Sequence, residues 1–404
     1  MKVLQINAVY GVGSTGHIVQ DIHETLLKNG HQSYIFWGIS NTEKKNGKNF
    51  IRIGNVLDHK LHALLRRILD NQGWNSRIAT WIACKRIEAI KPDVVHLHNL
   101  HSNYINLTIL LKFLSKENTA VLVTLHDCWF YTGYCNHYYN YQNCKQWQSG
   151  CQECPAVKQK ARKRIAKIYL EKEKLFSNIK RLAVNGVSKW TLQDVDDSIL
   201  HSARIKTYIY NWIDTSIFYP RNSRKKVHEK YDIPLNQKII LGVSQGWSEG
   251  KGLREFVELG KRCQGKATVI LVGHCDLQPN DKDNLKPLGF IRDRNELADL
   301  YSAADVYVNP SRMETFGLVT AEAMACGTPV VAYNNTGSKE IVTQQCGMLV
   351  EDGNAEQLCN GVTKILNEDK EQYYKACLDS VSLRFSKEGN IKKYIDLYMR
   401  LINA

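Results

Sequence analysis

One segment near residue 315 sets two carboxylates on either side of a strand-to-helix turn. A β-branched run, 304–309, ends at Pro310, and Glu314 follows in the loop. Gly317 permits a tight turn into a helix that carries Glu322, and Gly327-Thr328-Pro329 ends this helix before another apolar strand. A strand, a turn, a helix and a strand in this order indicate an α/β sheet.

This segment has the chemistry of a site for a nucleotide sugar. Unpaired backbone N–H groups at a helix start attract anions such as phosphates. Carboxylates accept hydrogen bonds from hydroxyl groups, which ribose and hexose supply. The alternative is that Glu314 and Glu322 are ordinary surface acids.

The wider segment decides between these two interpretations. From about residue 240 to 353 the chain resembles the retaining, nucleotide-sugar-dependent glycosyltransferases of the GT-B fold, with their Glu-x7-Glu signature. The resemblance includes Gly289-Phe290-Ile291, 301–305, 336–340 and 347–350. It implies an α/β protein with two Rossmann-like, doubly wound parallel-sheet domains that face each other across a deep cleft.

Length and composition agree with two domains. The chain has 404 residues, of which 43% are hydrophobic. We expect an acceptor-side domain at 1–205 and a nucleotide-sugar domain at 206–384, with a helix in 385–404 returning to the first domain. No uninterrupted apolar run of ~18 residues occurs, so we expect a cytoplasmic protein without a signal peptide, either free or peripheral on the inner face of the membrane.

A glycine-rich loop follows the first strand. Gly11, Gly13 and Gly16 match the Gly-x-Gly-x-x-Gly pattern of dinucleotide-binding enzymes. A dehydrogenase would also need a carboxylate at the end of the second strand, which instead runs into Gly38-Ile39-Ser40-Asn41. The glycosyltransferase resemblance places Gly13 and Gly16 beneath the donor phosphates.

Two further strands of the first domain end in polar residues. The three histidines His96, His98 and His101 could be metal ligands, but the segment lacks the adjacent Asp-His pair of two-metal sites. The strand 93–97 leads into His98, Asn99 and His101. Ligands bind at the carboxyl ends of parallel strands, so we expect these three residues to meet the acceptor. The strand 120–125 leads into His126, which the resemblance places against the transferred sugar.

Five cysteines occur between residues 128 and 154. The spacing of Cys135, Cys144, Cys151 and Cys154 allows a structural zinc site, with reduced buried thiols as the main alternative and disulfides as a third. A similar cysteine-rich insertion occurs in a subgroup of cell-surface polysaccharide transferases of the colanic-acid type.

The net charge of +14 indicates an anionic partner, and the residues 158–181 contain ten Lys or Arg and two Glu. Apolar residues at helical spacing make this segment a basic amphipathic helix. It could lie on an anionic membrane surface, or pack on its own domain by its apolar face. We expect no nucleic acid partner.

Lys251 is expected to hold the donor diphosphate, but the arginine that many family members place beside it is absent. Arg292, Arg294 and Arg312 are candidates to replace it. The resemblance adds Ile291 and Asp293 as donor contacts, together with the backbone of the turn formed by Thr315, Phe316, Gly317 and Leu318.

We therefore expect a metal-independent transferase that moves a hexose, with retention, to a lipid-linked saccharide acceptor. The resemblance assigns Glu314 to the sugar and Glu322 to the ribose. The alternatives are an epimerase or hydrolase of the same fold, and a binding protein that has lost catalysis. The sequence does not distinguish UDP from GDP, nor one hexose from another.

Overall fold

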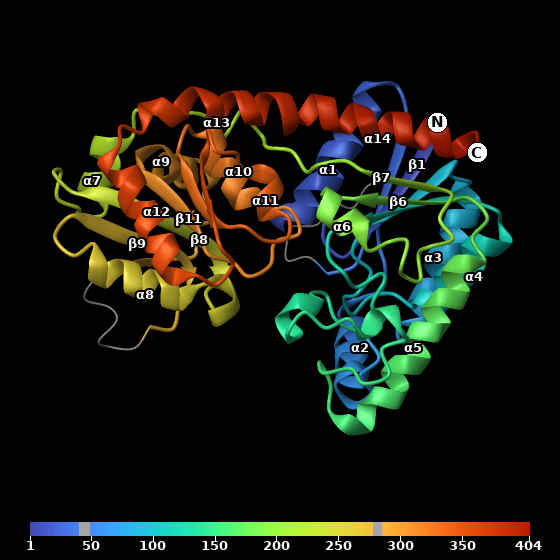
Figure 1. Ribbon diagram of the computed structural model, residues 1–404. Helices are drawn as coiled ribbons and strands as arrows, with labels where there is room; N and C mark the ends of the chain where they lie inside the picture. The colour runs from blue at the N-terminus through green and yellow to red at the C-terminus, as the bar shows by residue number, and fades with distance from the viewer. Residues whose placement is uncertain (40–48, 278–284) are drawn as a thin grey trace. The chain divides into compact units, whose positions relative to one another are not determined.

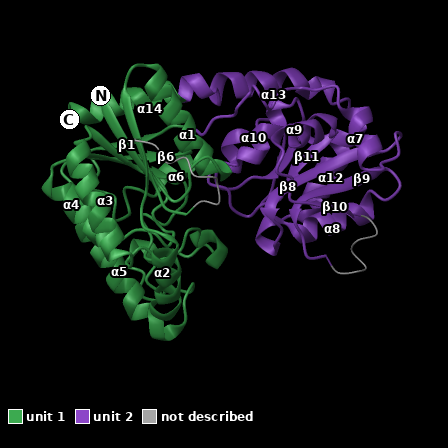
Figure 2. Cartoon of the chain, turned by 180° about the vertical axis from the view of Figure 1, so that it is seen from behind, with its two compact units in different colours: residues 1–209, 391–404 green, residues 210–390 purple. Residues whose placement is uncertain are grey.

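The computed structural model describes residues 1–39, 49–277 and 285–404. The chain forms two compact units, residues 1–209 with 391–404, and residues 210–390 (Figure 2). The sequence analysis set these boundaries at 205/206 and 384/385. The loop after the second strand, where a dehydrogenase would carry its carboxylate, continues at residues 40–48, outside the described residues.

Unit 1 is built on a parallel sheet with strand order β3-β2-β1-β4-β5-β6-β7 (Figure 1). Its strands are β1 Lys2–Asn7, β2 Gln32–Trp37, β3 Phe50–Arg52, β4 Val94–Leu97, β5 Ala120–Leu125, β6 Leu182–Gly186 and β7 Ile205–Tyr208. The central strands β4 and β5 are entirely buried, because helices cover both faces of such a sheet.

The helices of unit 1 are α1 Gly13–Lys28, α2 Val56–Leu69, α3 Arg77–Ile90, α4 Leu107–Lys116, α5 Gln159–Ser177 and α6 Lys189–Gln193. Two short 3-10 helices, Tyr138–Tyr141 and Gln146–Gln148, lie in the cysteine-rich segment. In the described residues, no helix combines the length and the apolar character that a bilayer crossing requires.

Unit 2 contains a second parallel sheet, with strand order β10-β9-β8-β11-β12-β13. Its strands are β8 Lys238–Gly246, β9 Ala267–His274, β10 Leu285–Gly289, β11 Val306–Asn309, β12 Val330–Tyr333 and β13 Gly347–Val350. Its core joins these strands to the apolar faces of α8 and α12 around Phe256, Leu259 and Val362.

The helices of unit 2 are α7 Arg224–Lys230, α8 Leu253–Arg262, α9 Arg294–Ala303, α10 Leu318–Ala325, α11 Ser338–Ile341, α12 Ala355–Asn367 and α13 Glu371–Arg384, with the 3-10 helix η3 at Glu249–Lys251. The helix α14, Lys387–Ile402, begins in unit 2, and its residues from 391 onward belong to unit 1.

Residues of α14 complete the polar core of unit 1. The hydroxyl of Tyr398 lies 2.8 Å from Nδ1 of His96 on β4, and that of Tyr394 accepts a 2.8 Å hydrogen bond from Asn185 on β6. Both tyrosines are fully buried. The α14 helix therefore satisfies side chains that would otherwise be buried without partners.

Each sheet reverses its winding direction once. The chain runs outward from β1 to β3 and then restarts at β4 beside β1, and it does the same from β8 to β10 and then at β11 beside β8. At such a point the loops at the carboxyl ends of the two central strands diverge and leave a crevice that binds ligands. The sheet topology thus marks one candidate position in each unit.

Candidate functional site

In unit 2, the loops that follow β8 and β11 at the reversal point carry Lys251 and Glu314. The Lys251 Nζ donates a 2.6 Å hydrogen bond to Glu314 Oε1 and lies 3.2 Å from the hydroxyl of Ser311. The side chain of Lys251 is 38% exposed and that of Glu314 is 17% exposed. The ammonium group is therefore held in place and still open to a ligand.

The loop after β12 supports Glu314 from its other side. The Glu314 N–H donates to the hydroxyl of Thr336 at 2.9 Å, and the Gly337 N–H donates to the Glu314 carbonyl at 2.8 Å. A Cβ atom on Gly337 would lie 2.6 Å from the Thr315 carbonyl oxygen, so only glycine permits this approach. The sequence analysis quoted this segment for its resemblance but gave it no role.

Gly317 begins α10 in a left-handed conformation, with φ of +98°, and no side chain caps the helix. Phe316 points away into the core, where its ring packs against those of Phe385 and Tyr210. The predicted turn of Thr315, Phe316, Gly317 and Leu318 thus precedes and opens a helix whose first N–H groups receive no side-chain cap.

Glu322 lies one turn into α10 and accepts a 3.2 Å hydrogen bond from the hydroxyl of Tyr301 on α9. Burial raises the pKa of its carboxyl group to about 7, against the opposing effects of Arg294 and Tyr301. Glu322 keeps part of its surface exposed, so a hydroxyl group of a ligand can reach it. Burial also raises the pKa of Tyr307, and the charges of both Glu314 and Glu322 raise it further, which shows that the two acids lie around the same buried strand residue.

Because the pKa of Glu322 is raised, the free energy of unfolding depends on pH through this residue. Its folded-state pKa of about 7 exceeds the value of about 4.3 for an unfolded chain. Between these values the native state binds the additional proton, so the free energy of unfolding falls as pH rises through this window. Glu322→Gln should therefore melt above wild type at about pH 8, with a smaller difference at about pH 5. The matched control Glu258→Gln changes a partly exposed acid paired with Arg262 at 2.7 Å. Equal melting temperatures of wild type and Glu322→Gln at both pH values would contradict this assignment.

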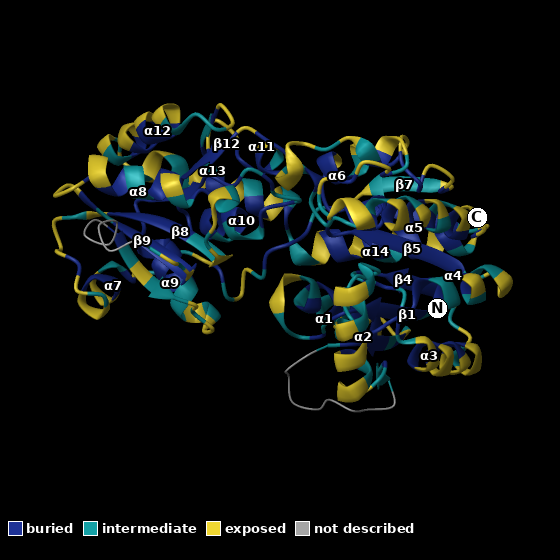
Figure 3. Ribbon diagram, turned by 90° about the horizontal axis from the view of Figure 1, so that it is seen from below, coloured by how far each residue is buried: buried dark blue, intermediate teal, exposed yellow. Residues whose placement is uncertain are grey.

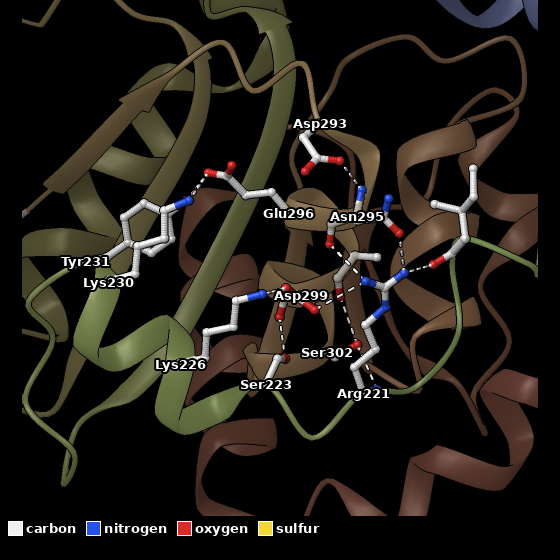
Figure 4. Close-up of polar contacts among 12 residues, drawn as sticks. Arg221, Ser223, Lys226, Lys230, Tyr231, Asp293, Asn295, Glu296, Asp299 and Ser302 are labelled. Carbon is white, nitrogen blue, oxygen red and sulfur yellow. Dashed lines mark hydrogen bonds and ion pairs between the residues drawn. The ribbon is translucent and has the colours of Figure 1, made fainter.

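Asp293 and Ile291 lie between β10 and α9. Asp293 accepts a 2.9 Å hydrogen bond from the Asn295 N–H and so caps α9 (Figure 4). The same helix is held by Arg221 and Lys226, whose side chains lie 3.3 and 2.6 Å from the two carboxylate oxygens of Asp299. Asp293 is exposed and Ile291 is partly exposed, and both follow the carboxyl end of an edge strand of the sheet.

The three candidate arginines differ in their surroundings. Arg312 is paired with Glu255 and Asp352 at 3.4 and 3.6 Å, so its charge is already neutralised. Arg294 stacks over the ring of Phe218 and lies 3.8 Å from Asp214, and its charge acts on Glu322. Arg292 is exposed. Arg294 is therefore the candidate cation whose influence on the Glu322 carboxylate is evident.

In unit 1, a chain of hydrogen bonds leads to His126. The Gln5 amide nitrogen donates to the Val19 carbonyl, so its Oε1 accepts from Nε2 of His98 at 3.1 Å. His98 Nδ1 then accepts from Nε2 of His126 at 2.9 Å, which leaves Nδ1 as the accepting nitrogen of His126. Burial lowers the pKa of His126 to about 4, so the ring is neutral at physiological pH.

The predicted acceptor residues of unit 1 occupy different depths. His98 is fully buried and both its nitrogens are bonded, so it supports His126 and does not itself contact a ligand. His101 is partly exposed and its Nε2 lies 2.8 Å from Asp127 Oδ2. Asn99 is partly exposed beside it, and its N–H donates to Asn7 Oδ1.

The glycine loop of unit 1 is shorter than predicted. The glycine pattern predicts a loop that includes Gly13 and Gly16, but α1 begins at Gly13, so both glycines lie in its first turn. Gly13 has a φ of +63°. A Cβ atom on Gly16 would lie 3.2 Å from the Gly11 nitrogen, which explains the small residue. The loop follows β1, at the reversal point of its sheet.

The four candidate zinc ligands are all free thiols in this structure. Burial raises the pKa of Cys135, Cys151 and Cys154, and each of these thiols also interacts electrostatically with Cys144. Across the described residues, no three His, Cys, Asp or Glu side chains are arranged to hold a metal ion. The zinc site stays a prediction.

The basic helix 158–181 is found as α5. Its apolar side chains Ile165, Ile168 and Phe176 are buried within unit 1, so this face packs on the domain. Lys172 is also buried, and its ammonium group donates to the carbonyls of Trp129 and Thr132 at 2.6 and 3.0 Å. Burial lowers the pKa of Lys172 to about 7. A lysine within a basic run carries no sequence signal for this interior role.

Other polar motifs have structural partners. Asp194, the first acid of an Asp-x-Asp sequence, is buried and accepts a 2.6 Å hydrogen bond from Tyr138. Asp196 pairs with Lys206. The first contact ties the cysteine-rich segment to the connection between α6 and β7, and the second ties this connection to β7.

Two parallel-sheet units with polar loops at their reversal points, and with an acid pair around α10, define a GT-B glycosyltransferase. Solved structures share this fold. Sucrose-phosphate synthase from Thermosynechococcus elongatus has a TM-score of 0.72 at 20% identity, with 100% of this chain and 99% of that chain covered. The protein HepE of Anabaena, solved with UDP, has a TM-score of 0.66 at 16% identity, with 99% and 100% covered.

The family follows from the sequence. The model of Glycosyltransferase Family 4 matches residues 15–217, and that of Glycosyl transferases group 1 matches residues 223–376. The chain belongs to Glycosyltransferase Family 4, whose model covers half of it, and unit 2 matches the group 1 model. It is 24% identical over 435 residues to WcaC of Escherichia coli strain K12, a glycosyl transferase assigned to colanic acid biosynthesis, with 99% of this chain and 100% of WcaC covered. The chain is therefore a glycosyltransferase related to those of polysaccharide biosynthesis.

Proposed function

We propose that this glycosyltransferase moves a hexose from a nucleoside diphosphate sugar to a hydroxyl group of a lipid-linked saccharide, with retention and without a catalytic metal. The observation that carries the proposal is the Lys251–Glu314 contact of 2.6 Å beside the uncapped start of α10. This position combines the fixed ammonium group of Lys251, the backbone N–H donors at the start of α10, and the Glu314 carboxylate, which can accept hydrogen bonds from hydroxyl groups.

The leaving diphosphate gains negative charge as the bond to the anomeric carbon breaks. Lys251 and the N–H groups at the start of α10 are fixed donors that stabilise this charge without having to reorganise. Glu314 orients Lys251 and accepts hydrogen bonds from the sugar hydroxyls. Glu322 accepts from the ribose, with its position fixed by the hydroxyl of Tyr301.

Unit 1 supplies an uncharged hydrogen-bond acceptor, Nδ1 of His126, for a hydroxyl group of the transferred sugar. The hydrogen bonds from Gln5 through His98 leave Nδ1 of His126 with its lone pair, so this atom accepts a hydrogen bond from a sugar hydroxyl. Attack on the face from which the diphosphate departs gives retention, with a donor phosphate oxygen accepting the proton of the acceptor hydroxyl.

The relation to WcaC supports a saccharide acceptor in surface polysaccharide synthesis. The exposed cations Lys160, Lys163, Arg164 and Lys167 on α5 support an enzyme that works at an anionic membrane surface, where lipid-linked saccharides are found.

The assay is turnover of UDP- and GDP-sugars with and without a polyprenyl-linked saccharide. The proposal requires release of nucleoside diphosphate that depends on the acceptor, and proton NMR must show a product with the anomeric configuration of the donor. An inverted product overturns the mechanism. Turnover without acceptor indicates a hydrolase or epimerase, and nucleotide binding without any turnover indicates a binding protein.

Metal removal tests the leaving-group assignment. Brief EDTA treatment should leave at least most of the transfer activity, because Lys251 and backbone donors neutralise the diphosphate. If EDTA abolishes transfer in a folded protein and Mg²⁺ or Mn²⁺ restores it, the metal-free mechanism is wrong. A structural zinc is tested separately by elemental analysis, in which Cys151→Ser with Cys154→Ser should release any bound metal.

A further inference from the structure

The α2 helix of unit 1 presents its apolar face to solvent. Leu57, Leu61, Leu64 and Ile68 recur at helical spacing and are 75, 57, 54 and 64% exposed. Its buried residues are His59 and His62. The hydroxyl of Ser76 lies 2.7 Å from His62, and the Ile53 carbonyl lies 2.8 Å from His59. This arrangement is the reverse of an ordinary amphipathic helix on a core, so the apolar face requires another partner.

The α3 helix repeats this arrangement over its first turns. Ile78, Trp81 and Ile82 are 75, 57 and 43% exposed, and the opposite face buries Thr80, Ala83 and Ile87. In Figure 3 exposed surface runs along both α2 and α3. Tryptophan is the side chain most typical of the boundary between lipid and water.

The two helices adjoin one hollow. A cavity of about 400 Å³ is lined by Asn55 and Asp58 at the start of α2 and by Ile78 and Ile82 on the exposed side of α3. Arg52 and Arg86 also line it. The eight exposed large apolar side chains of α2 and α3, which are Val56 and the seven named above, are defined here as the α2–α3 surface.

Basic residues surround this surface. Lys60, Arg67, Arg77, Lys85 and Arg86 are exposed on the same two helices. The only exposed acid of α2 and α3 among the described residues is Glu88, and it pairs with Lys85 at 2.8 Å. The α5 helix adds further cations at one end, because Arg164 donates to the Leu69 carbonyl at the last residue of α2.

We propose that the α2–α3 surface inserts into the headgroup region of an anionic bilayer and anchors the enzyme there. An anionic bilayer presents two layers, the acyl chains and the anionic headgroups. The leucines and isoleucines at the centre of the surface match the acyl chains, and the surrounding cations match the headgroups. The apolar face of α5 cannot serve, because it is buried in unit 1.

The first test measures sedimentation of the full chain with vesicles of phosphatidylglycerol and phosphatidylcholine in equal parts. Replacing Leu61, Leu64 and Ile68 by serine should lower the partition coefficient about 1,000-fold, because each leucine-sized side chain that the bilayer buries contributes about tenfold. The matched control replaces Leu235 and Leu383 of unit 2, which are 66 and 82% exposed. It should bind as wild type does, and circular dichroism should show that both variants fold.

The second test measures how deeply the α2–α3 surface inserts into the bilayer. Lipids brominated on their acyl chains should quench part of the tryptophan fluorescence, and Trp81→Phe should remove most of that quenching while binding persists. The α5 variant with Lys160, Lys163, Arg164 and Lys167 replaced by glutamine should bind more weakly and keep the quenching of its bound fraction.

Three results would overturn the proposal. They are absence of vesicle binding by wild type, unchanged binding by the serine variant, and quenching that does not depend on Trp81. A dimer of wild type in analytical ultracentrifugation that the serine variant converts to a monomer would show that a second copy of the chain covers this surface instead.

Discussion

Replacing Lys251 by alanine is expected to lower kcat by about 100- to 1,000-fold, the usual effect of removing one preorganised donor from a site of developing negative charge. The effect should fall on kcat more than on KM, because the diphosphate gains charge chiefly in the transition state. Steady-state kinetics with a saturating saccharide acceptor would measure both constants.

The control for this variant is Arg254→Ala. Arg254 lies in the first turn of α8, its side chain is 83% exposed, and it pairs with Glu249 at 3.3 Å. It should retain nearly full activity. Lys251→Arg should recover part of the loss, since it restores the charge but not its point-like shape. Wild-type kcat in Lys251→Ala would exclude Lys251 from the chemistry.

The second large effect separates the two glutamates. Glu322→Gln should weaken the binding of free nucleoside diphosphate by about 10- to 150-fold, the range of one hydrogen bond to a charged group. Glu314→Gln should bind the same nucleotide nearly as wild type does and lose turnover, because its ligand is the hexose, which the free nucleotide lacks.

Isothermal titration of nucleoside diphosphate into both variants, beside their transfer rates, distinguishes the two roles. The titration should be made well above pH 7, where the Glu322 carboxyl group of wild type is ionised. Equal losses of nucleotide affinity would refute the division of roles, and full activity of Glu322→Gln would remove Glu322 from the site.

Much of the fold, and the positions of the two candidate glutamates, could be predicted from local signals. The apolar runs 32–37 and 329–333 predict two strands, and the structure has them as β2 Gln32–Trp37 and β12 Val330–Tyr333, because apolar runs bounded by glycine and proline have few alternatives. The position of Glu314 and Glu322 around α10 follows from eight residues of spacing with one glycine between. No long-range information is needed for it.

Contacts between distant residues could not be predicted. His98 was expected to meet the acceptor, but its environment depends on Gln5, 93 positions earlier. The pattern of α2 and α5 shows that each has an apolar face, and only the packed unit shows that α5 buries this face while α2 exposes it. Gly13 was assigned to the loop of its Gly-x-Gly-x-x-Gly pattern, yet it is the first residue of α1.

The return of α14 to unit 1 has a consequence for synthesis on the ribosome. In the sequence, unit 2 lies between the two segments of unit 1. When residue 390 leaves the ribosome, the nascent chain therefore still lacks Tyr398 and Tyr394, which form hydrogen bonds with His96 and Asn185. Each buried polar group left without a partner costs about 1–3 kcal/mol. The first half of the chain therefore cannot complete its folding until the second half has been translated. We expect a truncated product to be degraded by proteases and not to persist as a half-enzyme.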